Sequence, residues 1–399
     1  MIGRLVGRRV FQNTSIQAFG TKSCPPARIA VVGAGWWAQG WHLPHLHNNP
    51  NAEIAAIVDP TPHPQSPLAS LTGVRMLSVS DLSQKYEAPS FVSLGDALGA
   101  IKDIDGVLIA TNHASHHALA MEAMEAGLHV FCEKPMTVDI DEAKDLAQRA
   151  ASSDLTFMVN NTANWREKTL MAEKMVSSGK VGEIKHATVL FHGPLQAVFD
   201  DPTNKSWNEP SGGMIGNGFA WGQLAHPLAW FFMVSGLTPA NVFAFNGKGT
   251  RTPADMYNAV AIECTNGATV SVSGCASYPG NDKVVEHRLI GTKGVLTYTG
   301  IAEDKGQSDG QQGNNAHLWQ GLSLKTYDGI HDTTIPGFDF ENTDADGNGP
   351  ESLCAFLAAC QGQPYHPGAD AQVGLKAVAA IDAIYRSAVS GVAETTHLG

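Results

Sequence analysis

The chain has 399 residues, a formal net charge of −12, 43% hydrophobic residues and 16% charged residues. These values are typical of a globular protein with two or three domains, and the negative charge argues against nucleic acid as a main partner. No apolar run reaches the roughly 18 residues that a membrane-spanning helix needs, so we expect no membrane association. The six cysteines form no C-x-x-C pair, which favours an intracellular protein with reduced thiols and predicts no metal site.

The first 27 residues differ in composition from the rest of the chain. They contain Arg4, Arg8, Arg9 and Lys22 but no Asp or Glu. An acid-free segment with arginines and hydroxyl residues is typical of a mitochondrial transit peptide. We therefore predict a targeting leader over residues 1–27; a disordered extension on a cytoplasmic protein is the alternative.

Short apolar runs alternate with helical stretches over residues 28–156. The runs that we predict as buried parallel strands are Arg28–Val32, Glu53–Val58, Gly106–Ala110 and His129–Cys132. The stretches that we predict as helices are Trp36–His47, His116–Ala126 and Asp139–Ala151. This alternation predicts a Rossmann domain, which is an α/β fold with a doubly wound parallel sheet, over residues 28–156.

After Phe157 the expected strands follow one another without helices between them. They are Glu183–His192, Val242–Asn246, Asn258–Cys264, Thr269–Ala276 and Val284–Ile290, with a hairpin turn at Asn266-Gly267. We expect Ala302–Asn315 to be an exposed loop and Ser352–Gln361 and Gln372–Ser390 to be helices. Residues 157–399 are therefore predicted to form a second, α+β domain with a mostly antiparallel sheet.

A dinucleotide-binding motif, G-x-G-x-x-A, directly follows the first predicted strand. It consists of Gly33, Gly35, Trp36, Trp37 and Ala38, with Ala34 between the glycines. The first glycine permits a tight turn, the second lets a pyrophosphate approach the backbone, and the small final residue lets the helix lie close to the sheet. The free N–H groups of the helix N-terminus then face the phosphates.

Asp59 ends the second predicted strand, where a carboxylate can bind the ribose hydroxyls of the cofactor. Because a carboxylate there would repel a 2′-phosphate, and no arginine follows nearby, the sequence favours NAD over NADP. The alternative is that Asp59 is a turn residue before Pro60.

Glu133-Lys134-Pro135 follows the strand His129–Cys132. Residues at the carboxyl ends of parallel strands face the ligand crevice. Lys134 at this place could donate a hydrogen bond to a substrate hydroxyl and stabilise its alkoxide, whereas a surface ion pair with Glu133 is the alternative.

These motifs together resemble those of the glucose-fructose oxidoreductase, inositol dehydrogenase and MocA family. The resemblance is carried by Gly33–Ala38, Asp59, Thr111-Asn112 before His116, Glu133-Lys134-Pro135 and the junction Ser178–Ile184. It implies that Thr111, Asn112, His116, Glu133 and Lys134 contact the cofactor.

Membership of this family would imply NAD(P)-dependent oxidation of a sugar-like or polyol-like alcohol, or the reverse reduction. It would also imply an open antiparallel sheet in a domain that binds substrate and mediates homodimers or homotetramers. The final helices are expected to pack back on the Rossmann domain.

The family's second signature, D-x-G-x-H-x-x-D, matches this chain only at His226. Gly222, Leu224 and Ala229 stand where the family has Asp, Gly and Asp. His226 is the candidate general base, because the unperturbed pKa of histidine lies near neutrality. A structural or substrate-binding role for His226 remains open. We predict that Asn217, Gln223, Trp165 and Arg166 contact the substrate.

The resulting hypothesis is an NAD-dependent dehydrogenase acting on a CH–OH group, with Lys134 and His226 as catalytic residues. Two alternatives remain open. One is a non-catalytic, NAD-binding regulatory protein, and the other is an enzyme that uses tightly bound NAD as a transient oxidant.

Overall fold

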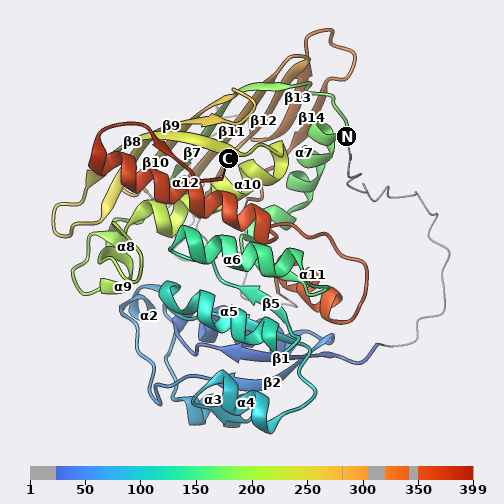
Figure 1. Cartoon of the computed structure of the whole chain (residues 1–399), viewed down its shortest axis with the longest axis vertical. Coiled ribbons are helices and arrows are strands. Elements are labelled where there is room, and N and C mark those ends of the chain that lie inside the picture. The colour runs from blue at the N-terminus through green and yellow to red at the C-terminus, as the bar shows by residue number, and fades with distance from the viewer. Residues whose placement is uncertain (1–23, 281, 304–319, 341–348, 399) are drawn as a thin grey trace, which may run out of the picture.

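The computed structural model describes residues 24–280, 282–303, 320–340 and 349–398. The predicted leader lies outside this part of the chain except for residues 24–27, and most of the predicted loop Ala302–Asn315 lies outside it as well. Two sheets organise the described residues (Figure 1).

The first sheet is parallel throughout and has the strand order β3-β2-β1-β4-β5-β6. Its strands are β1 (Ala27–Val32), β2 (Ala52–Val58), β3 (Ser90–Phe91), β4 (Gly106–Ile109), β5 (His129–Cys132) and β6 (Phe157–Val159). The predicted Rossmann sheet is confirmed, but β6 pairs with β5 and lies beyond the domain boundary that we predicted at residue 156. A strand of three residues gives too short an apolar pattern to be distinguished from the following segment.

Helices cover both faces of this sheet, as the predicted alternation requires. They are α1 (Leu43–Asn48), α2 (Pro67–Thr72), α3 (Val79–Tyr86), α4 (Leu94–Ala100), α5 (His116–Glu125) and α6 (Ile140–Ala151), with the short helices η1 (Ala38–His42) and η2 (His113–Ser115). Local signals fix their ends. Asp139 caps α6 by accepting hydrogen bonds from the N–H groups of Asp141 and Glu142, and Gly127, with φ +81°, follows α5.

The second sheet has nine strands in the order β14-β13-β12-β11-β7-β10-β9-β8-β15, and only β7 and β10 are parallel neighbours. The strands are β7 (Ile184–His192), β8 (Pro239–Lys248), β9 (Asp255–Cys264), β10 (Thr269–Cys275), β11 (Asp282–Gly291), β12 (Gly294–Glu303), β13 (Gly321–Thr326), β14 (Thr333–Pro336) and β15 (Glu394–Thr395). The mostly antiparallel sheet is therefore confirmed. Asn266-Gly267 forms the predicted hairpin turn between β9 and β10, with Gly267 at φ +78°.

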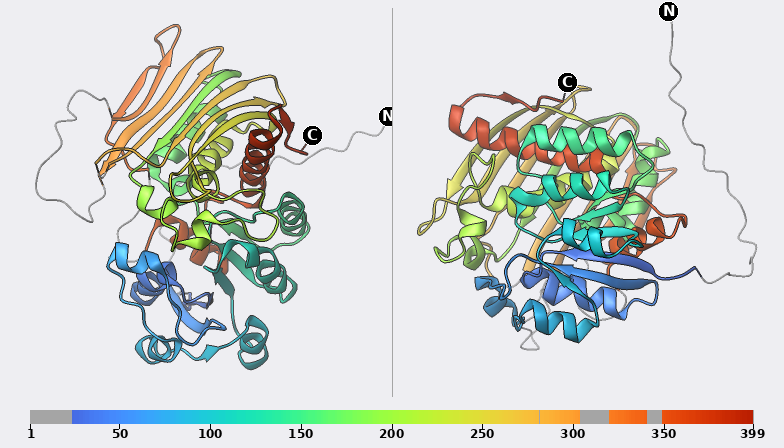
Figure 2. Two further views of the ribbon diagram at one scale, coloured as in Figure 1. Left: turned by 90° about the vertical axis from the view of Figure 1, so that its left-hand side faces the viewer. Right: turned by 60° about the horizontal axis from the view of Figure 1, so that its bottom comes forward.

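One face of the nine-stranded sheet packs on helices, and these lie between it and the Rossmann domain (Figures 1 and 2). The helices are α7 (Glu167–Ser177), α10 (Ala225–Ser235) and α12 (Ala371–Ser390), with the shorter α8 (Gln196–Phe199), α9 (Lys205–Asn208), η3 (Thr162–Trp165) and η4 (Ala220–Leu224). α11 (Glu351–Cys360) packs instead on β5 of the first sheet, where Phe356 stacks on Phe131. Burial alternates along β9, so that every second side chain points away from the helices. On that outer face Phe245 is 66% exposed and Tyr257 is 46% exposed.

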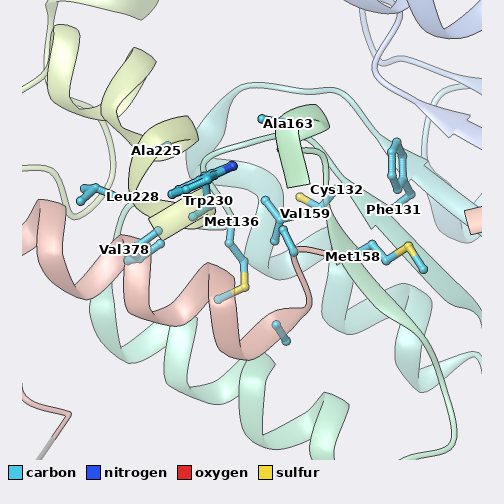
Figure 3. Packing of buried hydrophobic residues seen from close by; sticks show 14 of the residues in the cluster. Phe131, Cys132, Met136, Met158, Val159, Ala163, Ala225, Leu228, Trp230 and Val378 are labelled. Carbon is cyan, nitrogen blue, oxygen red and sulfur yellow. The ribbon is translucent and has the colours of Figure 1, made fainter. Parts of the chain in front are cut away.

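The final helix joins the two domains. α12 contacts both β8 and α6, and Met158 of β6 forms an isolated bridge with Asp370, which caps α12. Figure 3 shows buried side chains at this junction, among them Ala225 and Leu228 of α10, Val378 of α12, and Met136. The final helix α12 thus packs on α6 of the first domain as well as on the second sheet. No helix in the described residues is long and apolar enough to cross a membrane.

Candidate active site

The glycine-rich turn after β1 is shaped as the motif predicts. Gly33 has φ +95°, and a Cβ on it would lie 2.6 Å from the carbonyl oxygen of Ala110, so only glycine lets this turn pass the end of β4. A Cβ on Gly35 would meet no atom within 4 Å. Together, the tight turn and the open space above Gly35 fit a dinucleotide pyrophosphate that approaches the backbone.

Asp59 lies beside this turn and braces it. One carboxylate oxygen accepts a hydrogen bond from the N–H of Ala34 at 2.8 Å, and the other accepts one from the N–H of Thr61 at 2.8 Å. The carboxylate is half-buried at the end of β2, where we predicted it. Asp59 is therefore held as a turn residue, which was the alternative in the sequence analysis, and its contact with the ribose stays a prediction.

Ala38 is fully buried and begins η1, whereas the two tryptophans before it are half-buried. Trp36 packs edge-on against Trp37 with ring centroids 5.1 Å apart, and Trp37 stacks on Trp41 at 4.4 Å. The indole N–H of Trp37 donates a hydrogen bond to Glu133 Oε1 at 2.8 Å. Trp37 thus links the glycine-rich turn to the Glu133-Lys134-Pro135 segment.

Glu133 is held as a buried carboxylate. Besides Trp37, His42 Nε2 lies 2.8 Å from Oε1 and Asn160 Nδ2 donates to Oε1 at 2.7 Å, while the N–H of Lys134 donates to Oε2 at 3.2 Å. Burial opposes ionisation, but the hydrogen bond and charge of His42, the Asn160 amide and the Lys134 ammonium outweigh it and lower the pKa of Glu133 to about 2. Glu133 is therefore ionised at neutral pH.

Lys134 reaches from the first domain to the second. Its Nζ donates a hydrogen bond to the carbonyl oxygen of Gly222 in η4 at 2.5 Å. The same ammonium lies 5.1 Å from the ring centroid of Trp207 in α9. The predicted catalytic lysine thus lies at the boundary between the domains, which is a common place for ligand sites.

Two π-helical segments flank the Glu133-Lys134 pair. η1 ends at His42, which contacts Glu133, and η4 contains Gly222, which contacts Lys134. π-Helical turns are rare and occur frequently at functional sites, because the wider turn redirects side chains and backbone groups.

His226 lies in the first turn of α10, four residues after Gly222, and is 8% exposed. Because η4 continues directly into α10, His226 lies about one helical turn after Gly222, the residue that Lys134 contacts. The structure therefore brings the elements carrying Lys134 and His226 together.

The departures from the second family signature have a packing reason. A Cβ on Gly222 would lie 2.6 Å from the ring of Phe199 and 3.2 Å from Trp207, so two aromatic rings fill the space of the expected Asp. Ala229 is fully buried, and its carbonyl oxygen accepts a hydrogen bond from Asn164. An ionised side chain at either position would be buried against apolar groups.

The structure gives three predicted site residues other surroundings. His116 is fully buried, and its Nδ1 lies 2.9 Å from the carbonyl oxygen of Pro135, so it braces the Glu133-Lys134-Pro135 segment. Trp165 is buried and donates to the carbonyl oxygen of His366. Asn217 is buried and donates to the carbonyl oxygens of Ser206 and Glu209. These contacts show that the three side chains support the surrounding structure, and their predicted ligand contacts stay predictions.

The remaining predicted residues have less specific surroundings. Arg166, which follows η3, forms ion pairs with Asp339 and with Glu351 at the start of α11. Gln223 is half-buried in η4, beside the glycine that Lys134 contacts. Thr111 and Asn112 follow β4 next to Gly33, and Thr111 Oγ1 accepts a hydrogen bond from Ser115. Ligand contacts by these residues stay predictions.

The sequence analysis missed several residues around the site. His42 and Asn160 surround Glu133 but stand 91 and 27 residues from it in the chain. Trp207 and His113 lie beside Lys134; their rings are 5.4 Å apart at 89°, and burial is the main cause that lowers the pKa of His113. No local pattern marks these residues, although the cluster of histidines after the glycine motif is visible in the sequence.

Two family models match the chain. One, described as the oxidoreductase family with an NAD-binding Rossmann fold, covers residues 27–161, and the other, the GFO/IDH/MocA C-terminal domain, covers residues 169–297. The chain therefore belongs to the GFO/IDH/MocA family of oxidoreductases. This confirms the family and the cofactor class that the sequence predicted.

Similar proteins include a glycosyl hydrolase family 109 protein of Shewanella amazonensis, which is 32% identical over 41% of this chain and 35% of that protein. An inositol 2-dehydrogenase of Rhizobium meliloti is 24% identical over 43% of this chain and 47% of that protein. The chain thus spans about a third to a half of the length of these curated relatives.

Solved structures share the whole fold. GenD2 from gentamicin A biosynthesis, in complex with NAD, matches with a TM-score of 0.67 and 19% identity, over 96% of this chain and 99% of that one. Levoglucosan dehydrogenase, in complex with NADH and L-sorbose, matches with a TM-score of 0.65 and 17% identity, over 93% and 99%. At this identity the likeness concerns the fold.

Proposed function

We propose that the protein oxidises a CH–OH group of a sugar-like or polyol-like substrate with NAD, or catalyses the reverse reduction. One observation carries this proposal: Lys134 Nζ donates a hydrogen bond to the carbonyl oxygen of Gly222 in η4 at 2.5 Å. This contact lies near the glycine-rich turn and one helical turn before His226. A cation, a histidine and a dinucleotide motif therefore share one domain boundary.

The residues have distinct roles in this proposal. Gly33–Ala38 and Asp59 would hold NAD, which when bound supplies the acceptor for the hydride that leaves the substrate carbon. Lys134 donates a hydrogen bond to the substrate oxygen and stabilises the negative charge that develops as its proton leaves. His226 takes that proton and passes it to water, so that the alcohol becomes a carbonyl. Glu133, held by Trp37, His42 and Asn160, fixes the backbone from which Lys134 extends.

The test is a spectrophotometric assay of NADH formation from myo-inositol, levoglucosan and other cyclic or open-chain polyols, and of NADH consumption with L-sorbose. We expect Lys134→Ala and His226→Ala each to lower kcat by about 100-fold or more. Lys180→Ala, a change at an exposed lysine outside the site, serves as the control. Wild-type kcat in both site variants would contradict the assignment, and tight NAD binding without turnover of any compound would favour the regulatory alternative.

A second candidate is an enzyme that uses bound NAD as a transient oxidant in glycoside cleavage. It is favoured by the 32% identity to a protein named as a glycosyl hydrolase. Release of p-nitrophenol from p-nitrophenyl glycosides by protein that retains NAD through purification, without net NADH formation, would support it. A stoichiometric gain of NADH would contradict it.

We also propose a homodimer or homotetramer assembled through the outer face of the nine-stranded sheet. The exposed aromatic side chains Phe245 and Tyr257 on that face support it, because exposed apolar patches often mark interfaces. Light scattering should show a wild-type oligomer that Phe245→Lys weakens; a monomeric wild type would refute the proposal.

For residues 1–27 we propose mitochondrial targeting, on the basis of their acid-free, arginine-containing composition. Fusion of this segment to a fluorescent protein tests the proposal. A diffuse cytoplasmic signal would contradict it.

A further inference from the structure

An aromatic ring that the sequence analysis did not single out borders the proposed catalytic lysine. The centroid of Trp207 lies 5.1 Å from Lys134 Nζ, and its ring packs edge-on against His113 and Phe199 with centroids 5.4 and 6.1 Å away. Trp207 is half-buried in α9, a helix of only four residues.

Buried polar side chains hold the segment that carries Trp207. Isolated helices of four residues are not stable, so the position of α9 depends on these hydrogen bonds. The side-chain donors and their backbone acceptors are Asn204 to Val198 (2.8 Å), Asn208 to Asp201 (2.6 Å), and Asn217 to Ser206 (3.1 Å) and Glu209 (2.9 Å). Asp200 adds a second attachment, since its carboxylate accepts from the N–H groups of Arg251 and Thr252 at 2.7 and 3.1 Å. Trp207 is thereby fixed before any ligand binds, which favours precise recognition.

The glycine at position 222 makes room for this ring. A Cβ there would lie 3.2 Å from Trp207 and 2.6 Å from Phe199. Where the family signature has a carboxylate, this chain therefore has an aromatic surface beside Lys134.

We propose that Trp207 is a substrate-binding residue whose ring contacts the C–H face of a cyclic sugar or cyclitol, and that it selects such rings over open-chain polyols. This inference rests on the proposed function. A substrate oxygen that accepts a hydrogen bond from Lys134 Nζ lies about 2.8 Å from this nitrogen. Because Nζ lies 5.1 Å from the Trp207 centroid, the substrate oxygen is within about 8 Å of that centroid, a distance that a six-membered ring can span. The negative face of the indole attracts the partly positive C–H groups of such a ring. An open-chain polyol presents no continuous C–H face and loses more conformational freedom on binding.

The test compares Trp207→Phe, which keeps an aromatic ring, with Trp207→Leu, which keeps only an apolar side chain. Tyr327→Leu, a change at an exposed aromatic residue after β13, is the matched control. The measured quantities are kcat and KM for myo-inositol, levoglucosan and D-sorbitol, and the Kd for NAD.

We expect a KM within about threefold of wild type for Trp207→Phe and a KM for the cyclic substrate at least about tenfold higher for Trp207→Leu. The Kd for NAD should stay within about twofold, and the preference for rings over sorbitol should fall in Trp207→Leu alone. A KM in Trp207→Leu equal to that of the control would overturn the inference, as would an equal loss in Trp207→Phe.

If the proposed function is wrong, the wild-type protein will oxidise none of these compounds, a result that differs from the outcomes expected of the Trp207 variants. Saturation-transfer NMR of myo-inositol and levoglucosan on the protein–NAD complex would in that case decide the inference. Transfer in wild type and Trp207→Phe that is lost in Trp207→Leu would support it. No transfer in wild type, or undiminished transfer in Trp207→Leu, would overturn it.

Discussion

The hydrogen bonds around Glu133 predict a large effect of the isosteric change Glu133→Gln on stability. The carboxylate accepts from Trp37, His42 and Asn160 through one oxygen and from the N–H of Lys134 through the other, and its side chain is only 12% exposed. If a glutamine at position 133 keeps its oxygen toward Trp37, His42 and Asn160, its N–H₂ group faces the backbone N–H of Lys134. Two donors then face each other, and no hydrogen bond forms between them. The glutamine also replaces three charge-assisted hydrogen bonds with weaker neutral ones.

The magnitude follows from the pKa of Glu133. A fall from 4.5 in the unfolded chain to about 2 in the folded protein corresponds to about 3 kcal/mol of stability at pH 7. Because the folded-state pKa is the lower one, this stability is present above pH 4.5 and is lost as the pH falls toward 2. The difference between wild type and Glu133→Gln should therefore shrink by about 1 kcal/mol between pH 7 and pH 4.

Urea denaturation followed by tryptophan fluorescence at pH 7 and pH 4 measures both quantities. Glu125→Gln, at an exposed glutamate of α5, is the control and should behave as wild type at both pH values. If Glu133→Gln were as stable as wild type at pH 7, or if the difference did not change with pH, the account of Glu133 as a buried, stabilised carboxylate would be wrong.

Three further predictions concern other parts of the structure. His287 is fully buried, stacks on Trp230 at 4.4 Å, and burial lowers its pKa to about 3. A histidine with a lowered pKa reduces the free energy of unfolding as the pH falls below 6.5. Between pH 8 and pH 5, the free energy of unfolding of His287→Phe should therefore rise by about 2 kcal/mol relative to that of wild type. Parallel pH profiles of the two proteins in urea titrations would refute this. Asp59→Ala leaves the N–H groups of Ala34 and Thr61 without their acceptor and removes the charge that would repel a 2′-phosphate. In calorimetric titrations, the Kd for NADP divided by the Kd for NAD should therefore fall at least about tenfold. An unchanged ratio would argue against a ribose contact. Gly222→Ala places a methyl group 2.6 Å from Phe199, and we expect a melting temperature a few degrees lower and a higher KM; wild-type values in both would contradict the packing described around Lys134.

The sequence by itself determined the features that depend on neighbouring residues. The turn at Gly33 needs a positive φ, the strand before it needs apolar residues on both faces, and Asp59 must end the next strand; each requirement leaves its own pattern. The Rossmann sheet, the hairpin at Asn266-Gly267 and the cofactor class were therefore predictable. The end of the first domain was not, because β6 has only three residues and is defined by its pairing with β5.

Only the tertiary structure decided what surrounds the lysine. His42 reaches Glu133 across 91 residues and Lys134 reaches Gly222 across 88, and no local pattern encodes such contacts. The same holds for Asn217 and Trp207. Asn217 was expected to bind substrate because it is a polar residue in the glycine-rich stretch before His226, and only the structure shows that it holds the segment that carries Trp207. Residue type indicates what chemistry a side chain can do, whereas the packing of two domains decides which side chains face the ligand and which support them.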